Sequence, residues 1–321
     1  MSQTSGPRLK FFPIAWFAMI MGMAGFTIAW RRAEQVLGLS FTTTPILLPL
    51  TTGLALVLAV LLVAKVIKYP QEVLGEIRHP VKLVFVPTIS IGLILLSIAF
   101  LHLSPEVSFW LWASGTALHL ILTLYVLSSW IHHTKYEIAH LNPAWFIPVV
   151  GNILVPIAGI HHASPEISWF FFSLGLFFWP VLTAIIFYRL IFHGSLPERF
   201  MPTLFIFIAP PAVGFISYTN LVGGLDSFAR ILYGVALFFT LLLFVQIRYF
   251  VRLKFFLSWW AYSFPLAAIS ISTLIMAKET GLVFYLWMGG GLMTILTAVI
   301  AMLLVRTGIA VVRREICIEG H

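Results

Sequence analysis

Residues 142–190 contain the repeating unit of the chain in one stretch, NPAWFIPVVGNILVPIAGIHHASPEISWFFFSLGLFFWPVLTAIIFYRL. Two long apolar runs are separated there by Ser164-Pro165-Glu166. This order of residues is typical of a helix start, because the hydroxyl caps the first turn, proline fits the first position and the acid meets the positive end of the helix dipole. The stretch therefore predicts two long helices joined as a hairpin.

The composition places this hairpin in a membrane. Of 321 residues, 60% are hydrophobic and only 9% are charged, and the mean hydropathy is +1.02. Soluble domains contain roughly 25% charged residues, so a water-soluble fold is excluded. Helices satisfy their own backbone hydrogen bonds in lipid. We expect an all-α integral membrane protein of the plasma or inner membrane, with residues 1–321 forming a single transmembrane domain.

Ten apolar runs are long enough to cross a bilayer, which takes about 20 residues. They lie at about 12–30, 45–67, 83–102, 107–131, 143–160, 166–191, 201–219, 228–250, 255–277 and 283–305. The start of the second run is the least secure, because Pro45 and Pro49 also suit a loop. The first run follows Arg8 and Lys10 as in a signal peptide, but no small-residue cleavage site follows closely, so we expect a retained span.

The basic residues indicate the orientation. Only Arg31, Arg32, Arg230 and Lys278 follow odd-numbered spans, which leaves fifteen of the 19 Lys and Arg residues at the chain ends and after even-numbered spans. Loops rich in Lys and Arg stay in the cytoplasm. Both termini are therefore expected to be cytoplasmic, in agreement with an even number of spans.

A sequence repeat indicates how the spans are organised. Ser104-Pro105-Glu106-Val107-Ser108-Phe109 recurs sixty residues later as Ser164-Pro165-Glu166-Ile167-Ser168-Trp169. Two similar helix caps would explain this local match by themselves.

A wider pattern extends the repeat to the whole chain. Every odd span contains proline, namely Pro13, Pro87, Pro148, Pro210 with Pro211, and Pro265. Every odd span is also followed by one acid, namely Glu34, Glu106, Glu166, Asp226 and Glu279. Repetition of this kind reveals architecture. It predicts ten transmembrane helices as five helical hairpins, with a quasi-fivefold arrangement around a central pore.

Charged residues are missing from the middle of all ten runs. A charge at mid-bilayer costs about 2.5–3.5 kcal/mol, and pumps, ion-coupled carriers and voltage sensors keep such charges because they need them. Their absence argues against a carboxylate-driven pump and a cation channel lined by acids. It favours a neutral pore without acids in its lining, in which the surrounding cationic field selects anions.

The odd spans supply the candidate pore residues. We take Gly22, Asn152, Gly214 and Ser263 as candidate pore-lining residues, although small residues in membrane helices also serve close packing. Proline bends a helix and frees a backbone carbonyl. The expected pore-helix kinks are Pro87, Pro148, Pro210 and Pro265, although Pro87 is close enough to a helix start to be a first-turn proline.

Other chemistry finds little support. The single cysteine, Cys317, excludes a disulfide framework and a cysteine-based metal site. His132 and His133 are expected on the opposite face from His102, His161 and His162, and the latter three form either a weak pH-sensitive or metal cluster or ordinary interfacial hydrogen bonds. His119, inside a span, is expected to be structural. We expect no metal, no cofactor, no nucleic acid and no enzymatic activity, because no nucleophile–His–acid set or phosphate loop is present.

Several motifs resemble the TehA family, which includes bacterial tellurite-resistance proteins, slow-type plant anion channels and fungal malate and sulfite carriers. The specific match is Trp259-Trp260-Ala261-Tyr262-Ser263-Phe264-Pro265, which is similar to the ninth helix of the channel branch. Further similarity lies in Phe12-Pro13 with Phe17, Gly22, Gly25 and Trp30, in Asn142-Pro143 with Pro148 and Asn152, and in Ala209-Pro210.

This resemblance implies inner, kinked odd helices and outer even helices around a pore in each subunit of a homotrimer. It also implies that Phe264 is the pore gate, because the family closes its pore with a phenylalanine of the ninth helix. A ring at a constriction blocks ions yet needs only a small movement to clear.

Two functions remain open on these grounds. One is a passive channel for small monovalent anions such as chloride and nitrate. The other is a secondary transporter or exporter of small inorganic or carboxylate anions, such as C4-dicarboxylates, sulfite or tellurite. The uncharged spans favour the channel.

Overall fold

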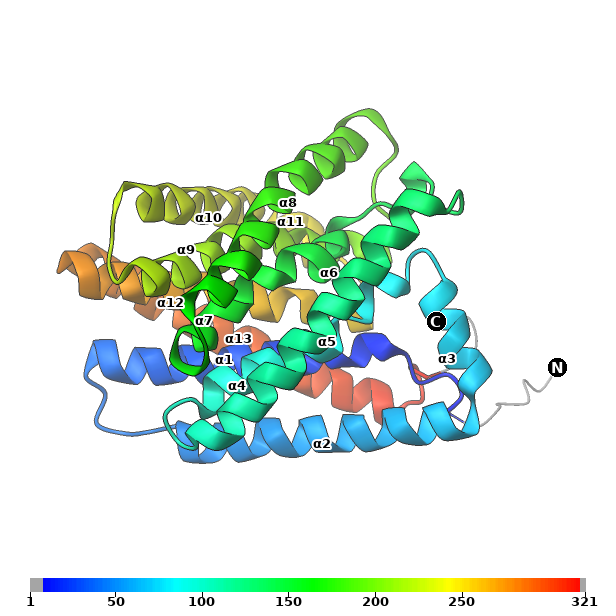
Figure 1. Ribbon diagram of the computed structural model, residues 1–321, viewed down its shortest axis with the longest axis horizontal. Helices are drawn as coiled ribbons and strands as arrows, with labels where there is room; N and C mark the ends of the chain where they lie inside the picture. Colours follow the sequence, from blue (N-terminus) through cyan, green and yellow to red (C-terminus); the bar gives the residue numbers. More distant parts are fainter. Residues whose placement is uncertain (1–7, 318–321) are drawn as a thin grey trace.

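The computed structural model describes residues 8–317, and within these residues every regular element is a helix (Figure 1). Ten helical segments are long and apolar enough to cross a membrane, as predicted. They are Ile14–Leu37, Thr44–Lys68, Leu83–Phe100, Pro105–His132, Pro143–His162, Pro165–Phe192, Glu198–Val222, Ser227–Val245, Leu257–Thr280 and Val283–Val312. The chain is therefore a multi-pass membrane protein. Its described part, residues 8–317, begins and ends at the same end of the bundle, which we call the terminal face (Figure 1).

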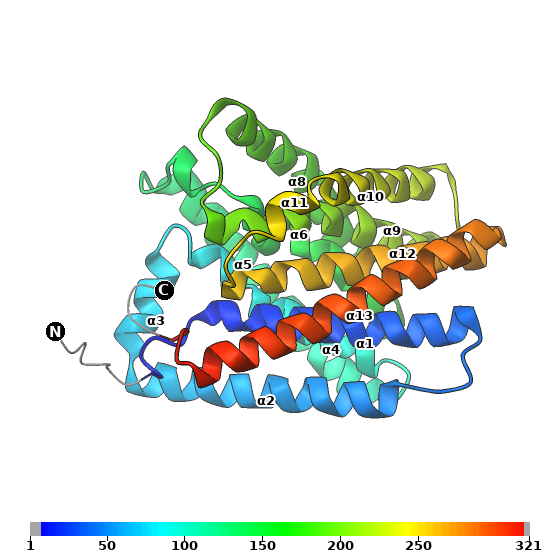
Figure 2. The same ribbon diagram turned by 180° about the vertical axis from the view of Figure 1, so that it is seen from behind.

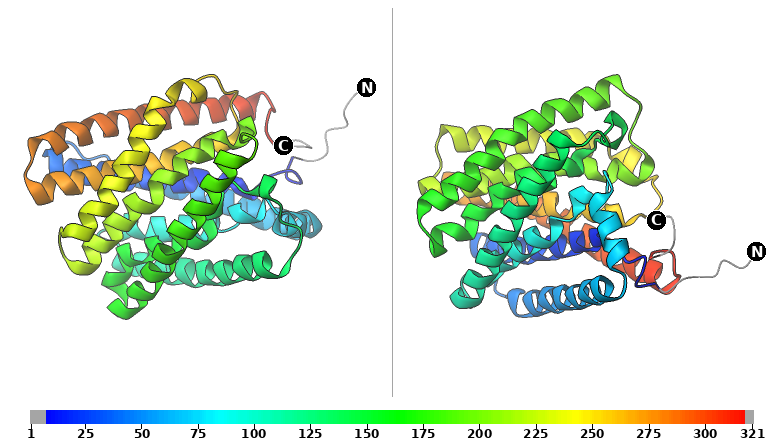
Figure 3. Two further views of the ribbon diagram at one scale, coloured as in Figure 1. Left: turned by 90° about the horizontal axis from the view of Figure 1, so that it is seen from above. Right: turned by 45° about the vertical axis from the view of Figure 1, so that its right-hand side comes forward.

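Odd and even spans differ sharply in burial. In the most apolar 18-residue stretch of each span, the odd spans are 72–89% buried, whereas the even spans are only 17–39% buried. The odd spans are thus inner helices and the even spans outer helices. In the view turned by 45°, the second span (Thr44–Lys68) lies along the lower edge of the bundle (Figure 3, right). Hydropathy alone does not separate the two groups, because lipid and the protein interior both accept apolar side chains.

The inner helices form a closed ring. Helix α1 (Ala18–Leu37) packs on α4 (Thr88–Phe100), and α4 packs on α7 (Val155–His162). Helix α7 in turn packs on α9 (Ala209–Val222), α9 on α12 (Ser263–Thr280), and α12 on α1. Each contact joins helices from neighbouring hairpins, and the last joins the two ends of the series.

Each inner span begins as a 3₁₀ helix at the terminal face and continues as an α-helix. The 3₁₀ segments are η1 (Ile14–Phe17), η2 (Leu83–Phe85), η4 (Pro143–Trp145), η6 (Glu198–Ile208) and η7 (Leu257–Tyr262). In the third inner span, α6 (Phe146–Val150) and η5 (Gly151–Leu154) follow before α7. Proline occurs near these transitions because it cannot donate the i→i−4 hydrogen bond of an α-helix.

The outer helices are uninterrupted, and four of the five have 25 residues or more. They are α2 (Thr44–Lys68), α5 (Pro105–His132), α8 (Pro165–Phe192), α10 (Ser227–Val245) and α13 (Val283–Val312). Seen from behind, α13 crosses in front of α1 and α12 (Figure 2). Pro45 lies in the first turn of α2 and Pro49 inside it, so neither belongs to a loop. Helix α8 also continues through Pro180.

The repeated Ser-Pro-Glu motif has the expected role at both sites. Ser104 and Ser164 are N-caps whose hydroxyl oxygens accept backbone hydrogen bonds, from Val107 and Glu166 respectively, and proline is at N1 in both helices. Asp226 caps α10 in the same way by accepting from the amide of Ala229 at 2.8 Å.

Two short helices lie outside the spans. They are α3 (Pro70–Arg78), which follows α2 at the terminal face, and α11 (Ile247–Phe250), which follows α10. Helix α3 falls between the second and third apolar runs, so the hydropathy pattern did not predict it. It brings two acids toward the inner helices, as described below.

Candidate functional site: a cavity along the ring of inner helices

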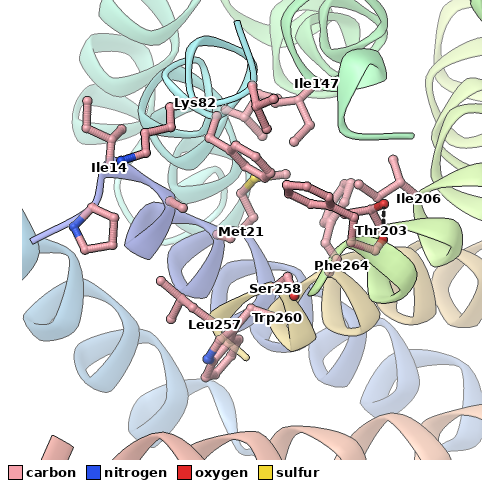
Figure 4. Close-up of a pocket in the computed structure, with 18 of the residues that line it drawn as sticks. Ile14, Met21, Lys82, Ile147, Thr203, Ile206, Leu257, Ser258, Trp260 and Phe264 are labelled. Atoms are coloured by element: carbon pink, nitrogen blue, oxygen red, sulfur yellow. Dashed lines mark hydrogen bonds between the residues drawn. The ribbon is translucent and has the colours of Figure 1, made fainter. Parts of the chain in front are cut away.

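A cavity of about 740 Å³ lies inside the ring and receives residues from all five inner spans. Its lining begins with residues at the ends of spans on the terminal face, including Lys10, Lys82 and Arg199, and ends at Phe264. Figure 4 shows side chains from different spans converging on this space, with Lys82 and Ile14 on one side and Phe264 on another. We call the part near Lys10, Lys82 and Arg199 the vestibule.

The vestibule contains both acids and bases. Glu72 and Glu76, both on α3, belong to the lining, so the expectation of a lining without acids is wrong at this end. Each acid is paired: Lys10 Nζ lies 3.3 Å from Glu72 Oε1, and Lys65 Nζ lies 2.6 Å from Glu76 Oε1. Since α3 lies outside the spans, the absence of charges from the middle of the apolar runs does not constrain it.

Two lining cations remain outside any ion pair among residues 8–317. They are Lys82 and Arg199, and both side chains are exposed. Because both acids are paired with lysines, the net charge of the side chains that line the vestibule is positive. A cleft with an excess of positive charge raises the local concentration of anions.

His79 lies among these cations in the turn between α3 and η2. Its Nδ1 accepts hydrogen bonds from the amides of Val81 at 3.1 Å and Lys82 at 3.3 Å. Partial burial lowers the pKa of His79 below its ordinary value of 6.5, and the positive charges of Lys82, His140, Arg199 and Lys135 lower that pKa further. The imidazole is therefore neutral at pH 7, where it acts as an acceptor for its own turn.

Beyond the vestibule the wall becomes apolar. Met21, Ile147, Ile206 and Trp260 contribute side chains to it, and Phe264 is at the inner end (Figure 4). The Thr203 hydroxyl, also on the lining, donates to the carbonyl of Phe200 at 2.6 Å and is thus satisfied by its own helix. This section offers few polar groups to an ion.

A second, much smaller cavity of about 30 Å³ continues on the other side of Phe264. Apart from Phe264, its lining consists of five pairs, each three residues apart on one inner span: Gly25 and Ile28, Leu95 and Ile98, Leu154 and Ile157, Val213 and Ile216, and Ala268 and Ile271. Residues three apart lie on one face of a helix. Every inner span therefore turns an equivalent face toward this space.

Phe264 lines both spaces, together with Leu154 and Val213. It lies in the first turn of α12, one residue before Pro265, and its side chain is only half-buried. Opposite the ring is Gly25, where an added Cβ would lie 3.2 Å from Phe264 Cδ2 and 3.1 Å from Ala267 Cβ. The missing side chain at Gly25 thus leaves the room that the ring of Phe264 occupies.

The four candidate pore-lining residues lie behind the walls of both cavities. Gly22 on α1 faces Ser263 on α12, and an added Cβ at Gly22 would come within 2.2 Å of Ser263 Oγ. Ser263 is buried, and its hydroxyl donates to the carbonyl of Trp260 at 2.5 Å. This pair allows α1 and α12 to approach closely.

Asn152 and Gly214 have similar positions. The Asn152 side chain is fully buried and donates to Thr123 Oγ1 at 2.9 Å and to the carbonyl of Val149 at 2.8 Å. Gly214 faces Ile153, whose Cδ1 would lie 3.2 Å from an added Cβ. A lining role for these four residues remains a prediction.

The expected kink prolines occupy different local positions. Pro210 and Pro265 line the large cavity, close to the change from 3₁₀ to α geometry. Pro148 lies inside the short helix α6, and Pro87 is the N-cap of α4. Pro13, which we did not list among the kinks, also lines the cavity. Whether these positions bend in a moving pore is a prediction about function.

The histidines form no metal site in the part of the chain that the structure describes. His102 and His161 approach with ring centroids 6.5 Å apart, and His162 Nε2 lies 2.8 Å from the hydroxyl oxygen of Ser108. Partial burial, together with Arg31 and His161, lowers the pKa of His102. The buried His119 lies 2.9 Å from Ser90 through Nδ1, as expected of a structural histidine.

Sequence reasoning missed Glu76 and Lys65, and it named Gly25 without selecting it as a pore residue. Gly25 is next to Phe264, whereas the sequence offered no reason to prefer it to Gly22. Glu76 and Lys65 are eleven residues apart in the sequence and form an ion pair. The sequence feature that could have predicted this pair is the amphipathic segment PQEVLGEIR, which follows the second apolar run directly. Such short polar segments are easily taken for loops, since a nine-residue helix is marginal without tertiary contacts.

The chain is similar to known membrane proteins over nearly all its length. The family model described as voltage-dependent anion channel matches residues 11–308. An uncharacterised transporter of Methanocaldococcus jannaschii is 28% identical over 88% of this chain and 90% of its own length. The S-type anion channel SLAH2 of Arabidopsis thaliana is 30% identical over 85% of this chain, a region that makes up 54% of that channel.

A tellurite resistance protein TehA homolog of Haemophilus influenzae is 26% identical over 81% of this chain and 80% of its own length. Together with the ten apolar helices, these similarities agree with the resemblance noted in the ninth span. These relatives are described as transporters, channels and a resistance protein. The chain belongs to the voltage-dependent anion channel family, which also includes the TehA homolog.

Proposed function

We propose that this chain is a passive anion channel that conducts small monovalent anions, such as chloride and nitrate, along the axis of its inner helices. The observation that supports this most directly is the position of Phe264 on both cavities. Leu154, Val213 and Phe264 line both spaces, and Phe264 is the aromatic residue among these three. Phe264 is accordingly proposed to be the gate.

The arrangement of the inner spans supports a single axial path. Five spans contact one another in a closed cycle and present equivalent pairs of residues to the small cavity. We therefore propose a quasi-fivefold pore. In this arrangement a small tilt of one helix changes the width at the constriction without breaking the ring of contacts.

A phenyl ring suits this role for physical reasons. It fills a narrow apolar space with a rigid group that offers no hydrogen bonds, so an ion at the constriction would lose water without compensation. The side chain is only half-buried, and Gly25 opposite bears no side chain. A rotamer change or a slight movement of α12 would open the path, and the positive edge of the ring is compatible with a passing anion.

The charge distribution supports anions over cations. Glu72 and Glu76 are paired, whereas Lys82 and Arg199 have no ion pair among the described residues. We further propose that the terminal face is cytoplasmic, as the distribution of Lys and Arg favours. The protein would then be a homotrimer of the plasma or inner membrane with one pore in each subunit.

The test is the chloride and nitrate current of the wild type compared with Phe264→Ala in planar bilayers. We expect small wild-type currents and a conductance at least about tenfold larger in Phe264→Ala, because removing a barrier of about 1.4 kcal/mol already changes a rate tenfold. Phe264→Leu should give an intermediate conductance, because it retains part of the volume. Phe177→Ala is the matched control, since Phe177 is on the outer helix α8 and 65% exposed.

The same experiment separates a channel from a secondary transporter. Channel currents should be ohmic, anion-selective and independent of a proton gradient. If Phe264→Ala remains silent while uptake of labelled malate or sulfite saturates and follows the proton gradient, the channel proposal is wrong. Equal currents in Phe264→Ala and Phe177→Ala would remove Phe264 from the gate.

A further inference from the structure

The vestibule contains two Lys–Glu pairs that differ in burial. In the pair of Lys10 and Glu72, the side chains are 39% and 44% exposed. In the pair of Lys65 and Glu76, they are 0% and 10% exposed. Both glutamates lie on α3 and line the cavity, so each would present a negative charge to a passing anion if its lysine were absent.

Lys65 and Glu76 together hold the start of the first inner span. Lys65 Nζ donates to Glu76 Oε1 at 2.6 Å and to the carbonyl oxygen of Phe12 at 2.7 Å. The second oxygen of Glu76 accepts from the backbone amide of Ile14 at 3.1 Å. Pro13 lies between the two backbone groups and lines the cavity. The pair therefore binds the backbone on both sides of a residue in the cavity wall.

The burial of this pair matters for the field in the vestibule. Water and salt screen exposed charges, whereas charges away from solvent are screened much less. Glu76 is 9% exposed as a residue and touches the cavity, so its charge would act on ions at short range. Its only ion-pair partner among residues 8–317 is Lys65.

We propose that Lys65 is a charge-selectivity determinant of the vestibule. By pairing with Glu76 inside the protein, it removes a negative charge from the wall of the anion path and leaves Lys82 and Arg199 to set the sign of the field. Lys65 itself is fully buried and acts on the ion only through Glu76, so it is a positioning residue rather than a binding site. This inference rests on the proposed anion conduction through the cavity.

The two members of the pair have opposite electrostatic effects, and this provides the test. The ratio of chloride to sodium permeability is measured from reversal potentials in a salt gradient, in the Phe264→Ala background so that the path is open. Lys65→Met leaves Glu76 without its counter-charge and should lower the ratio about tenfold, as expected for an unscreened charge near the path. Glu76→Gln leaves Lys65 as the uncompensated charge and should keep the ratio unchanged or raise it.

Three further variants separate charge from structure. Lys65→Arg keeps the charge and should preserve the ratio. The double variant Lys65→Met/Glu76→Gln has no unpaired charge and should restore the ratio toward that of the background. Lys10→Met is the matched control, since it frees Glu72 in the same vestibule, and its effect should be smaller and vanish at high salt because that pair is exposed.

The outcomes distinguish this inference from the proposed function. If Phe264→Ala conducts no anions, the proposed function fails before the pair is tested. If it conducts but Lys65→Met and Glu76→Gln shift the ratio in the same direction, or neither shifts it, the selectivity role of Lys65 is wrong and the pair only holds the helix start. If Lys65→Met does not fold, a fall in the ratio for Glu76→Gln overturns the inference by itself.

Discussion

At the scale of single residues, the vestibule depends on which side chains are charged and which are neutral. His79 is the clearest example, because its neutral imidazole accepts two backbone hydrogen bonds while four cationic or titratable groups face it. Protonation would place a proton on Nδ1, where the amides of Val81 and Lys82 now donate. The same event would add a positive charge beside Lys82 and Arg199.

We predict that His79 makes the fold less stable in acid. Its pKa is lowered in the folded protein relative to 6.5 in the unfolded chain, so the unfolded state binds more protons as the pH falls. The contribution of the neutral imidazole is fully present above pH 6.5 and is lost as the pH falls from there through the folded-state pKa. Melting temperatures of wild type and His79→Asn between pH 8 and pH 5 measure this.

Asparagine can accept the same amide hydrogen bonds without titrating. We therefore expect His79→Asn to lose less stability than the wild type over the acid range, with similar melting temperatures at pH 8. Parallel curves for the two proteins would contradict the assignment. His133→Asn is a suitable control, since His133 is exposed at the end of α5 and no described hydrogen bond involves its side chain.

At the scale of helices, the small residues of the inner spans serve contact between helices. Gly22 and Ser263 show this, because α1 and α12 approach so closely that a Cβ at Gly22 would overlap Ser263 Oγ at 2.2 Å and approach Ser263 Cβ at 2.8 Å. Close approach of this kind is a main source of stability between helices in lipid, where no hydrophobic effect drives them together. The outer helix α2 offers the contrast, since nothing lies within 4 Å of a Cβ at Gly53.

We predict that Gly22→Ala destabilises the protein by about 1–3 kcal/mol, as expected for overpacking. Ser263→Gly in the same chain should recover much of this loss, because it removes the two nearest atoms that the new methyl group meets and leaves Trp260 Cε3 at 3.0 Å. Gly53→Ala should be close to neutral. Unfolding in detergent, followed by the same probe in all four proteins, provides the measurement. Equal effects at positions 22 and 53 would show that the contact is not tight.

At the scale of the whole molecule, the ten spans bring the first and last described residues, 8 and 317, to one face, and residues near that face line the large cavity. The orientation of that face decides whether anions meet Lys82 and Arg199 on entering or on leaving the cell. At the face opposite the terminal face, the first, fourth and fifth inner spans end at C-cap glycines in the left-handed conformation. These glycines are Gly38, Gly223 and Gly281. These turns place the connecting loops of three hairpins on the opposite face.

We predict that the terminal face is cytoplasmic. In a Cys317→Ser background, which contains no other cysteine, Arg252→Cys introduces a thiol on the terminal face and Leu103→Cys one on the opposite face. Both positions are exposed. An impermeant maleimide should label Leu103→Cys in intact cells and Arg252→Cys only after the membrane is opened. The reverse pattern would invert the topology and the direction in which anions meet the vestibule.

The composition and the spacing of apolar runs were sufficient for the class, the number of spans and the hairpin unit. Charged residues are excluded from the bilayer centre because their desolvation is costly, so the spans can be recognised in the sequence as long runs without charged residues. The Ser-Pro-Glu caps were also predictable, because a cap depends on neighbouring residues. Phe264 was identified by its resemblance to a family, and its position on both cavities came from the structure.

What the sequence could not determine is which face of each inner helix points to the axis. A soluble helix reveals its buried face by an alternation of polar and apolar residues, but an inner membrane helix is apolar all round and buried on every side. Gly22 and Gly25 therefore looked equivalent, and only the rotation of α1 in the ring placed Gly25 against Phe264. In the same way, the pairing of Lys65 with Glu76 required the fold, because a polar segment outside the spans acquires its partners only when tertiary contacts hold it as a helix.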